Sequence, residues 1–140
     1  MRVQNRMHGL RIAAAVGCAA ILIAAGCGRK VSYEEVLKEN AESMNRKCPI
    51  LVEKDVRLDS TSAGPGRRFT YHYTLLDRTL DSMDVKSFEN RLRPNLTNNL
   101  RTNKNLEILR RNRANVDYRF FDKKGRFLLT ISVESGDYKK

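Results

Sequence analysis

Cys48 and His72 are the two residues whose side chains could together support nucleophilic catalysis. A histidine can accept the proton of a cysteine thiol, but such a pair needs an activated thiolate and a third group that orients the imidazole ring. Cys48 is followed by Pro49 and the apolar residues 50–52, which favours an inert core cysteine, and His72 falls on a strand pattern that favours a surface position. We therefore expect no catalytic residue.

The sequence contains no clear motif for a metal site or a phosphate-binding site. Downstream of residue 27 the chain has one histidine and one cysteine, too few for a typical zinc site. Asp77, Asp81 and Asp84 lack the spacing of an EF-hand loop, and a helix cap at Asp81 or Asp84 explains them more simply. No nucleophile elbow, phosphate-binding glycine loop or His-Glu-x-x-His helix occurs. We expect no metal and no cofactor.

Positive charge is the strongest chemical signal in the chain, whose formal net charge is +11. The residues proposed to form an anionic-partner patch are Arg101, Lys104, Arg110, Arg111 and Arg113. Such a field favours phospholipid head groups, lipopolysaccharide or an acidic protein as partner, and a solvated helix face is the alternative. We expect no nucleic acid partner, because no helix-turn-helix, zinc-finger or RNA-binding motif accompanies the charge.

Residues 1–26 have the order of a bacterial export signal. Three arginines precede an uncharged run over 12–23, which is shorter than the roughly 20 residues that a membrane-spanning helix needs. Ala24-Ala25-Gly26 then precedes Cys27, and this layout resembles a lipoprotein signal peptide. The resemblance implies cleavage before Cys27, a diacylglycerol and an N-acyl chain on that cysteine, and a lipid anchor in the membrane. Because Ala24 replaces the usual leucine, a plain secretory signal is the alternative.

The remaining chain is long enough for one domain. We expect a lipidated tether over 27–31, a single domain over 32–135 and a polar tail over 136–140. Removal of three arginines and no acidic residue leaves a net charge of +8 out of +11. Gly28 stands where an aspartate retention signal would be, which resembles lipoproteins on the periplasmic face of the outer membrane. The remaining thiol, on Cys48, is either buried or available for an intermolecular disulfide.

Helical and strand patterns alternate along this domain. Ser32 and Glu35 have the spacing of a capping box and predict a helix that ends near Lys47. Alternating residues predict strands over 56–59 and 69–75, joined by a turn at 62–66. An apolar stripe predicts a second helix over 85–100, with a kink or break at Arg93 caused by Pro94, and a shorter helical piece over 106–111.

A second hairpin completes the predicted fold, with strands over 116–120 and 127–133 and a turn at 122–125. The order α-β-β-α-(α)-β-β predicts an α+β two-layer sandwich, in which helices cover one face of a four-stranded antiparallel sheet. On the return strand, Phe127, Leu129, Ile131 and Val133 should face inward. The open face of the sheet should carry Thr70, His72, Thr74, Asp117, Arg119, Leu128, Thr130 and Ser132.

Six segments of the chain are similar to a family of small secreted bacterial proteins of unknown function. They lie at 44–49, 56–61, 69–75, 94–96, 101–103 and 118–125. The shared features are a Cys-Pro after one helix, a Tyr-x-Tyr strand, a proline-bearing helix and a hairpin with an Asp and a Gly. This resemblance supports the fold and brings no reaction or catalytic residue. Size, lipidation and mixed α/β content also resemble secretion pilotin lipoproteins, which escort an outer-membrane secretin subunit.

These observations predict a non-enzymatic envelope lipoprotein that binds a protein partner at the membrane surface, in an assembly or escort role. A lipid anchor confines the domain to a thin layer, which raises the effective concentration of partners there. The first alternative is a periplasmic immunity or inhibitor protein that blocks an acidic toxin or enzyme domain. The second is an enzyme that acts on envelope polymers.

Overall fold

The computed structural model describes residues 30–139, so the export signal and Cys27 lie outside the described residues. Its elements, in chain order, are α1 (Tyr33–Asn45), β1 (Ile50–Glu53), β2 (Val56–Gly64), β3 (Arg68–Leu75), η1 (Leu80–Ser82), α2 (Val85–Thr102), η2 (Lys104–Leu106), α3 (Glu107–Arg111), β4 (Asn115–Phe121), β5 (Phe127–Val133) and α4 (Ser135–Tyr138). Within residues 30–139, no helix has the length and apolar character needed to cross a bilayer.

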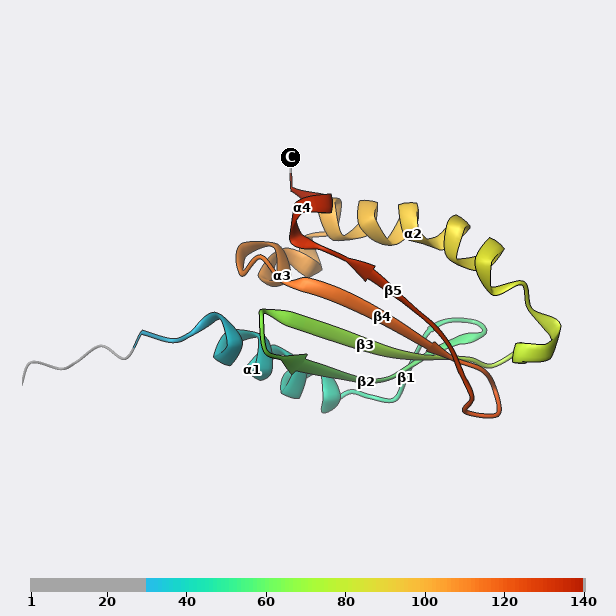
Figure 1. Cartoon of the computed structure of the whole chain (residues 1–140). Helices are drawn as coiled ribbons and strands as arrows, with labels where there is room; N and C mark the ends of the chain where they lie inside the picture. Colours follow the sequence, from blue (N-terminus) through green and yellow to red (C-terminus); the bar gives the residue numbers. More distant parts are fainter. Residues whose placement is uncertain (1–29, 140) are drawn as a thin grey trace, which may run out of the picture.

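The sheet has five strands in the order β1-β2-β3-β4-β5 and is mixed (Figure 1). Neighbours pair antiparallel except β3 and β4, which run parallel. The α+β class is confirmed, but the prediction of four antiparallel strands is wrong. Residues 50–53 form an additional edge strand that folds back on β2. The helical connection from β3 returns the chain to the end where β3 began, and this crossover makes the next strand parallel.

Helices α1 and α2 cover the same face of the sheet. Thr61 on β2 donates its hydroxyl to the carbonyl of Ala41 on α1, at 3.1 Å. Phe88 on α2 meets Phe120 on β4 edge to face, with ring centroids 5.4 Å apart. Thr61 of β2 pairs with Tyr71 of β3, which pairs with Tyr118 of β4, so Thr61 and Tyr118 lie on one face of the sheet. Phe120 lies on the same face, because residues two apart on a strand share a face.

Both long helices begin at the caps that the sequence indicates. The Ser32 hydroxyl accepts a hydrogen bond from the Glu35 backbone N–H at 3.1 Å, and the Glu35 carboxylate accepts one from Ser32 N–H at 2.9 Å. Asp84 caps α2 by accepting a hydrogen bond from the Ser87 backbone N–H at 3.0 Å. The expected break at Arg93 is absent, because α2 continues through Pro94 to Thr102. Pro94 is exposed, so the carbonyl that it leaves unpaired on Asn90 can reach water.

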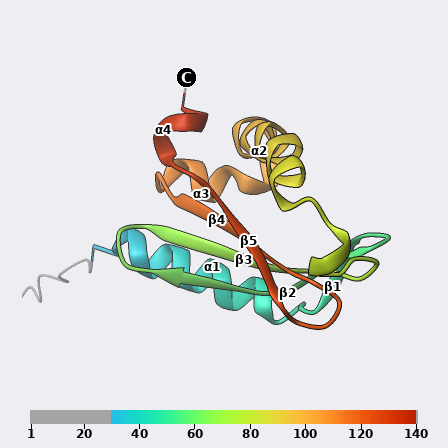
Figure 2. The ribbon, with the colours of Figure 1, turned by 45° about the vertical axis from the view of Figure 1, so that its right-hand side comes forward.

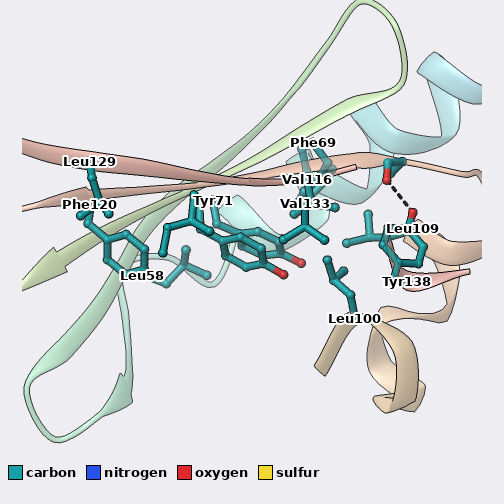
Figure 3. Close-up of a cluster of buried hydrophobic side chains, with 14 of the residues drawn as sticks. Leu58, Phe69, Tyr71, Leu100, Leu109, Val116, Phe120, Leu129, Val133 and Tyr138 are labelled. Atoms are coloured by element: carbon teal, nitrogen blue, oxygen red, sulfur yellow. Dashed lines mark hydrogen bonds between the residues drawn. The ribbon is translucent and has the colours of Figure 1, made fainter. Parts of the chain in front are cut away.

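The core fills the space between the covered face of the sheet and the two helices (Figures 2 and 3). Its fully buried members include Leu37 of α1, Leu100 of α2, Leu109 of α3, Phe69, Val116, Ile131 and Val133. The expected polar tail over 136–140 is wrong as far as Tyr138, which lies in α4 and is 2 % exposed. Its hydroxyl donates to the Ala114 carbonyl at 2.5 Å, and this bond ties the C-terminal helix to the start of β4.

Two core tyrosines differ from Tyr138 in how their hydroxyls are satisfied. Tyr71 and Tyr118 stack with ring centroids 5.4 Å apart, and neither buried hydroxyl has a hydrogen-bond partner among the described residues. Burial, followed by the neighbouring tyrosines, raises the pKa of both phenols. An unpaired buried hydroxyl costs free energy, and its removal relieves that cost.

Replacement of Tyr118 by phenylalanine is therefore expected to leave the free energy of unfolding unchanged or to raise it by up to about 1 kcal/mol. Tyr138→Phe is the matched control and should lower it by about 1 kcal/mol, because that hydroxyl has an acceptor. Urea unfolding followed by circular dichroism measures both values. A larger loss for Tyr118→Phe than for Tyr138→Phe would show that the Tyr118 hydroxyl is paired in solution.

Candidate functional site

A groove of about 480 Å³ opens between the β1–β2 turn and α2. Its floor is formed by Tyr73 and Leu75 of β3 and by Phe120 of β4. One wall is the apolar side of α2, with Phe88, Leu92 and Leu96, and the other is the segment 52–56. We call this feature the α2 groove.

The α2 groove exists because the two helices leave one end of the sheet uncovered. Phe88, Leu92, Leu96 and Leu100 follow one another every four residues on the same side of α2. Leu100 is fully buried, whereas Phe88, Leu92 and Leu96 are only half-buried. The part of α2 near its start therefore presents apolar side chains that no other described element covers completely.

The strand beside the α2 groove is also apolar and exposed. Ile50, Leu51 and Val52 of β1 are 39 %, 65 % and 46 % exposed. β1 pairs with β2 on one side only, so its other edge has free backbone hydrogen-bonding groups. Exposed apolar side chains beside an open strand edge are typical of surfaces that bind another polypeptide.

The rim of the α2 groove carries charges of both signs. Glu53, Lys54 and Asp55 lie on the β1 side, and Asp77 and Arg78 lie beyond the end of β3. A second hollow of about 300 Å³ shares Arg78, Phe88 and Leu92 with the groove and continues to Arg91 and Asn95.

Arg78 and Arg91 give this extension its charge. The Arg78 guanidinium is 3.6 Å from the Asp77 carboxylate, and Arg91 donates to the Ser87 carbonyl at 3.3 Å. Among the described residues, Arg91 forms no salt bridge, although its charge, after the hydrogen bonds from Ser87, helps to lower the pKa of Asp84. The extension of the groove therefore suits an acidic group.

The five residues of the expected anionic-partner patch are not equally available. Arg110 is half-buried and donates to the carbonyls of Leu100 and Asn103 at 2.8 and 2.6 Å, where it holds the end of α2. Arg111 pairs with Glu107 at 2.6 Å, and Arg101 donates to the Asp137 carbonyl at 3.3 Å.

Arg101, Lys104 and Arg113 are the exposed members without an ion pair inside the described part of the chain. Binding of an anionic partner by the patch stays a prediction, and these three residues are the most available for it. Arg110 is structural, because its guanidinium satisfies carbonyl groups that a helix end leaves unpaired.

The structure does not bring Cys48 and His72 together. Cys48 is half-buried against the core, and burial, followed by the charge of Asp59, raises the pKa of its thiol. His72 lies on the opposite face of the sheet, with its Nε2 3.3 Å from the Ser62 hydroxyl. Burial, followed by Arg119, lowers the pKa of the His72 imidazole. A thiol that is harder to ionise and an imidazole on the other face do not form a nucleophilic pair.

The three carboxylates considered for a metal site have structural partners. Asp84 caps α2, Asp77 lies beside Arg78, and Asp81 accepts a hydrogen bond from Arg126 at 2.8 Å. The hydrogen bond from Arg126 lowers the pKa of Asp81. Within residues 30–139, no group of three or more histidine, cysteine or acidic side chains could hold a metal ion.

The open face of the sheet differs from its prediction at Phe127 and Leu128. Phe127 was expected to face inward, but it is 48 % exposed and lies edge to face with Phe121, at 5.9 Å between centroids. The Arg119 guanidinium lies 5.7 and 5.4 Å from the centroids of these two rings. Leu128 is buried. An irregularity in the β4–β5 register at Phe120/Phe121 shifts the alternation and explains both differences.

Three solved structures share this fold. A protein from Pseudomonas aeruginosa described as secreted has a TM-score of 0.64 and 17 % identity, over 76 % of this chain and 93 % of that one. The type 2 secretion pilotin EpsS of Vibrio vulnificus has a TM-score of 0.59 and 8 % identity, over 77 % and 93 %. The pilotin AspS of Vibrio cholerae has a TM-score of 0.56 and 8 % identity, over 75 % and 91 %.

At these identities, the likeness establishes a shared fold. No curated protein sequence matches the chain. A family model does match, and it covers residues 32–129, from the N-cap of α1 into β5. This chain is therefore a member of the family defined by the domain of unknown function DUF8479.

Proposed function

We propose that this chain is a non-enzymatic protein-binding module of the bacterial cell envelope, which escorts or helps to assemble an outer-membrane protein. A lipid on Cys27 holds it on the periplasmic face of the outer membrane in this proposal. The α2 groove carries the proposal, because it is the place where half-buried apolar side chains lie next to an open strand edge.

The chemistry of the α2 groove defines the partner segment. Phe88, Leu92 and Leu96 offer apolar contacts spaced one helical turn apart, so the partner should present an apolar stripe of similar length. Arg91 lines the extension of the groove and forms no salt bridge among the described residues, so it suits an acidic residue at one end of that stripe. We infer an amphipathic segment of an envelope protein, with a carboxylate near its end.

The shared fold of the two Vibrio pilotins supports this proposal. Those proteins are pilotins of type 2 secretion systems, and the extension of an escort role to this chain is part of the proposal. Nothing in the arrangement of Cys48 and His72 favours an enzyme, and no described feature favours an immunity protein over an escort.

Capture from cells tests the proposal. The intact chain with a C-terminal affinity tag is crosslinked in its native host, recovered from solubilised membranes and washed over a salt series. We expect one envelope protein to be recovered near stoichiometry and to resist the salt washes, because apolar contacts are screened little by salt. Recovery of a toxin or enzyme domain would replace the escort role by inhibition. If salt removes all recovered proteins, the groove has no specific partner and the proposal fails.

A further inference from the structure

One end of the domain contains the start of α1 and two arginines with positive φ angles, Arg67 and Arg113. The start of α1, the β2–β3 turn and the connection from α3 to β4 all lie at this end (Figures 1 and 2). The Arg67 guanidinium lies 3.9 Å from the centroid of the Tyr33 ring. The Arg67 carbonyl accepts a hydrogen bond from Asn115 N–H at 2.9 Å, which joins the turn to the start of β4.

The side chains exposed here are of the kinds that occupy a membrane interface. Val31 and Tyr33 are 58 % and 48 % exposed, Lys30 precedes them and is exposed, and Arg113 is exposed in the connection from α3 to β4. Aromatic rings and long basic side chains place an apolar body near lipid and a polar tip in the head groups. The acidic residues of this end include Glu34 and Glu35 in the first turn of α1, where they stabilise the helix start, and Asp117 and Glu134, which pair with Arg68 at 2.8 and 3.4 Å.

Arg67 and Arg113 also hold an uncommon backbone conformation. Their φ angles are 58° and 53°, and within residues 30–139 they are the two non-glycine residues with positive φ. Glycine adopts this region without steric cost, whereas other residues are uncommon there. Arginine at both positions keeps two positive charges at one end of the domain, at a cost in backbone strain.

The length of the tether limits how far the start of α1 can lie from a lipid on Cys27. Five peptide steps separate Cys27 from Ser32, and each spans at most about 3.6 Å, so the start of α1 can stand no more than about 18 Å from a lipid on Cys27. The α2 groove lies at the other end of β3, near Leu75. At about 3.3 Å per residue, the eight residues of β3 separate the groove from this end of the domain by roughly 25 Å along the strand.

We propose that the end formed by Lys30, Tyr33, Arg67 and Arg113 docks on an anionic phospholipid surface, so that the α2 groove is directed away from the membrane. This inference rests on the lipid anchor of the proposed function for the orientation, but not on the identity of the groove's partner. It assigns the half-buried Arg67 of the β2–β3 turn and the exposed Arg113 of the α3–β4 connection to phosphate groups of lipids.

Tryptophan reporters test the orientation directly, because the chain contains no tryptophan. Tyr33→Trp places a reporter at the proposed membrane end, and Phe127→Trp places one at the distant β4–β5 turn. The lipidated full chain is reconstituted into phosphatidylglycerol–phosphatidylcholine vesicles that contain brominated lipid. We expect strong quenching of Tyr33→Trp and little quenching of Phe127→Trp. Equal quenching of both reporters, or stronger quenching of Phe127→Trp, would overturn the orientation.

Charge variants test the lipid chemistry without the anchor. The full mature chain carrying Cys27→Ser is sedimented with the same vesicles at low salt. Removal of two basic residues through Arg67→Gly and Arg113→Gly should weaken binding roughly 10- to 30-fold. Glycine also relieves the strained backbone, so the fold should be retained, which a thermal melt verifies.

Lys123→Ala together with Lys124→Ala is the matched control, because it removes the same charge from the exposed β4–β5 turn. An equal loss of binding in this control would show that only net charge matters and would overturn the proposal. Failure of the Cys27→Ser chain to bind anionic vesicles would overturn it as well. Neither result depends on the capture of a protein partner, so failure of the docking surface and failure of the escort role are separable.

Discussion

Replacement of Leu92 by arginine is expected to abolish capture of the partner, with a loss of affinity of at least about 100-fold. Leu92 lines both the α2 groove and its extension, midway along the apolar stripe of α2. An arginine there puts a charge where the partner's apolar side chains would pack, and a desolvated charge without a partner is strongly unfavourable. Capture by the tagged, lipidated chain, followed by quantitative mass spectrometry, measures the effect.

Asn98→Arg is the matched control for this prediction. Asn98 lies on the same helix, is exposed and does not line the groove, so the same new charge should leave capture unchanged. Leu92 is only half-buried in the free protein, so an arginine can extend into water and the fold should persist. Undiminished capture by a folded Leu92→Arg chain would exclude the α2 groove as the binding site.

Replacement of Asp122 by asparagine is expected to cause a large loss of stability, with a fall in melting temperature of about 5–10 °C. The Asp122 side chain is fully buried and accepts hydrogen bonds from the backbone N–H groups of Leu80, Lys124 and Arg126, and from the Arg126 guanidinium at 2.8 Å. These bonds hold η1 against the β4–β5 turn. In asparagine the negative charge is absent, and one carboxylate oxygen is replaced by an NH₂ group. That NH₂ group would point at N–H donors instead of accepting hydrogen bonds from them.

The same carboxylate predicts a pH dependence. Burial acts to raise the pKa of Asp122, but the hydrogen bonds from Arg126, Leu80 and Lys124 outweigh it and lower the pKa to about 2. A carboxyl group whose pKa is lower in the folded state than in the unfolded chain stabilises the fold at pH values above the unfolded pKa. This contribution is lost as the pH falls through the pKa of the folded state.

The difference in melting temperature between the wild type and Asp122→Asn should therefore shrink as the pH falls from about 4 to about 2. Calorimetry across this range measures it. Lys123→Ala leaves the Asp122 carboxylate and its hydrogen-bond donors in place, so its melting temperature should depend on pH as that of the wild type does. A difference that stays constant with pH would show that the Asp122 carboxylate is not held ionised in the fold.

The parts of the fold that follow local rules could be predicted from the sequence. The capping box at Ser32 and Glu35, the apolar stripe of α2 and the alternation in β3 each depend on residues close in the chain, and all three are confirmed. The parallel pairing of β3 with β4 depends on where a long helical connection returns. Sequence periodicity carries no information on that return, so the two hairpins were wrongly joined into one antiparallel sheet.

The candidate site was harder to predict than the fold. Ile50, Leu51 and Val52 are apolar, which suggested burial, and only the strand order shows that they form an exposed edge. Arg110 lies in a run of basic residues, and only the placement of the end of α2 shows that its guanidinium is used internally. The α2 groove itself arises from a gap in helix coverage, a property of the packing that no single segment encodes.

Photo-crosslinking in living cells tests directly whether the α2 groove binds the partner. A photo-reactive amino acid is placed at Leu96, inside the α2 groove, and in a second strain at Thr130, on the open face of the sheet. We expect one crosslinked envelope protein from position 96 and none from position 130. A crosslink from position 130 alone, or none from position 96 in a folded and membrane-bound chain, would contradict the claim that this groove binds the partner.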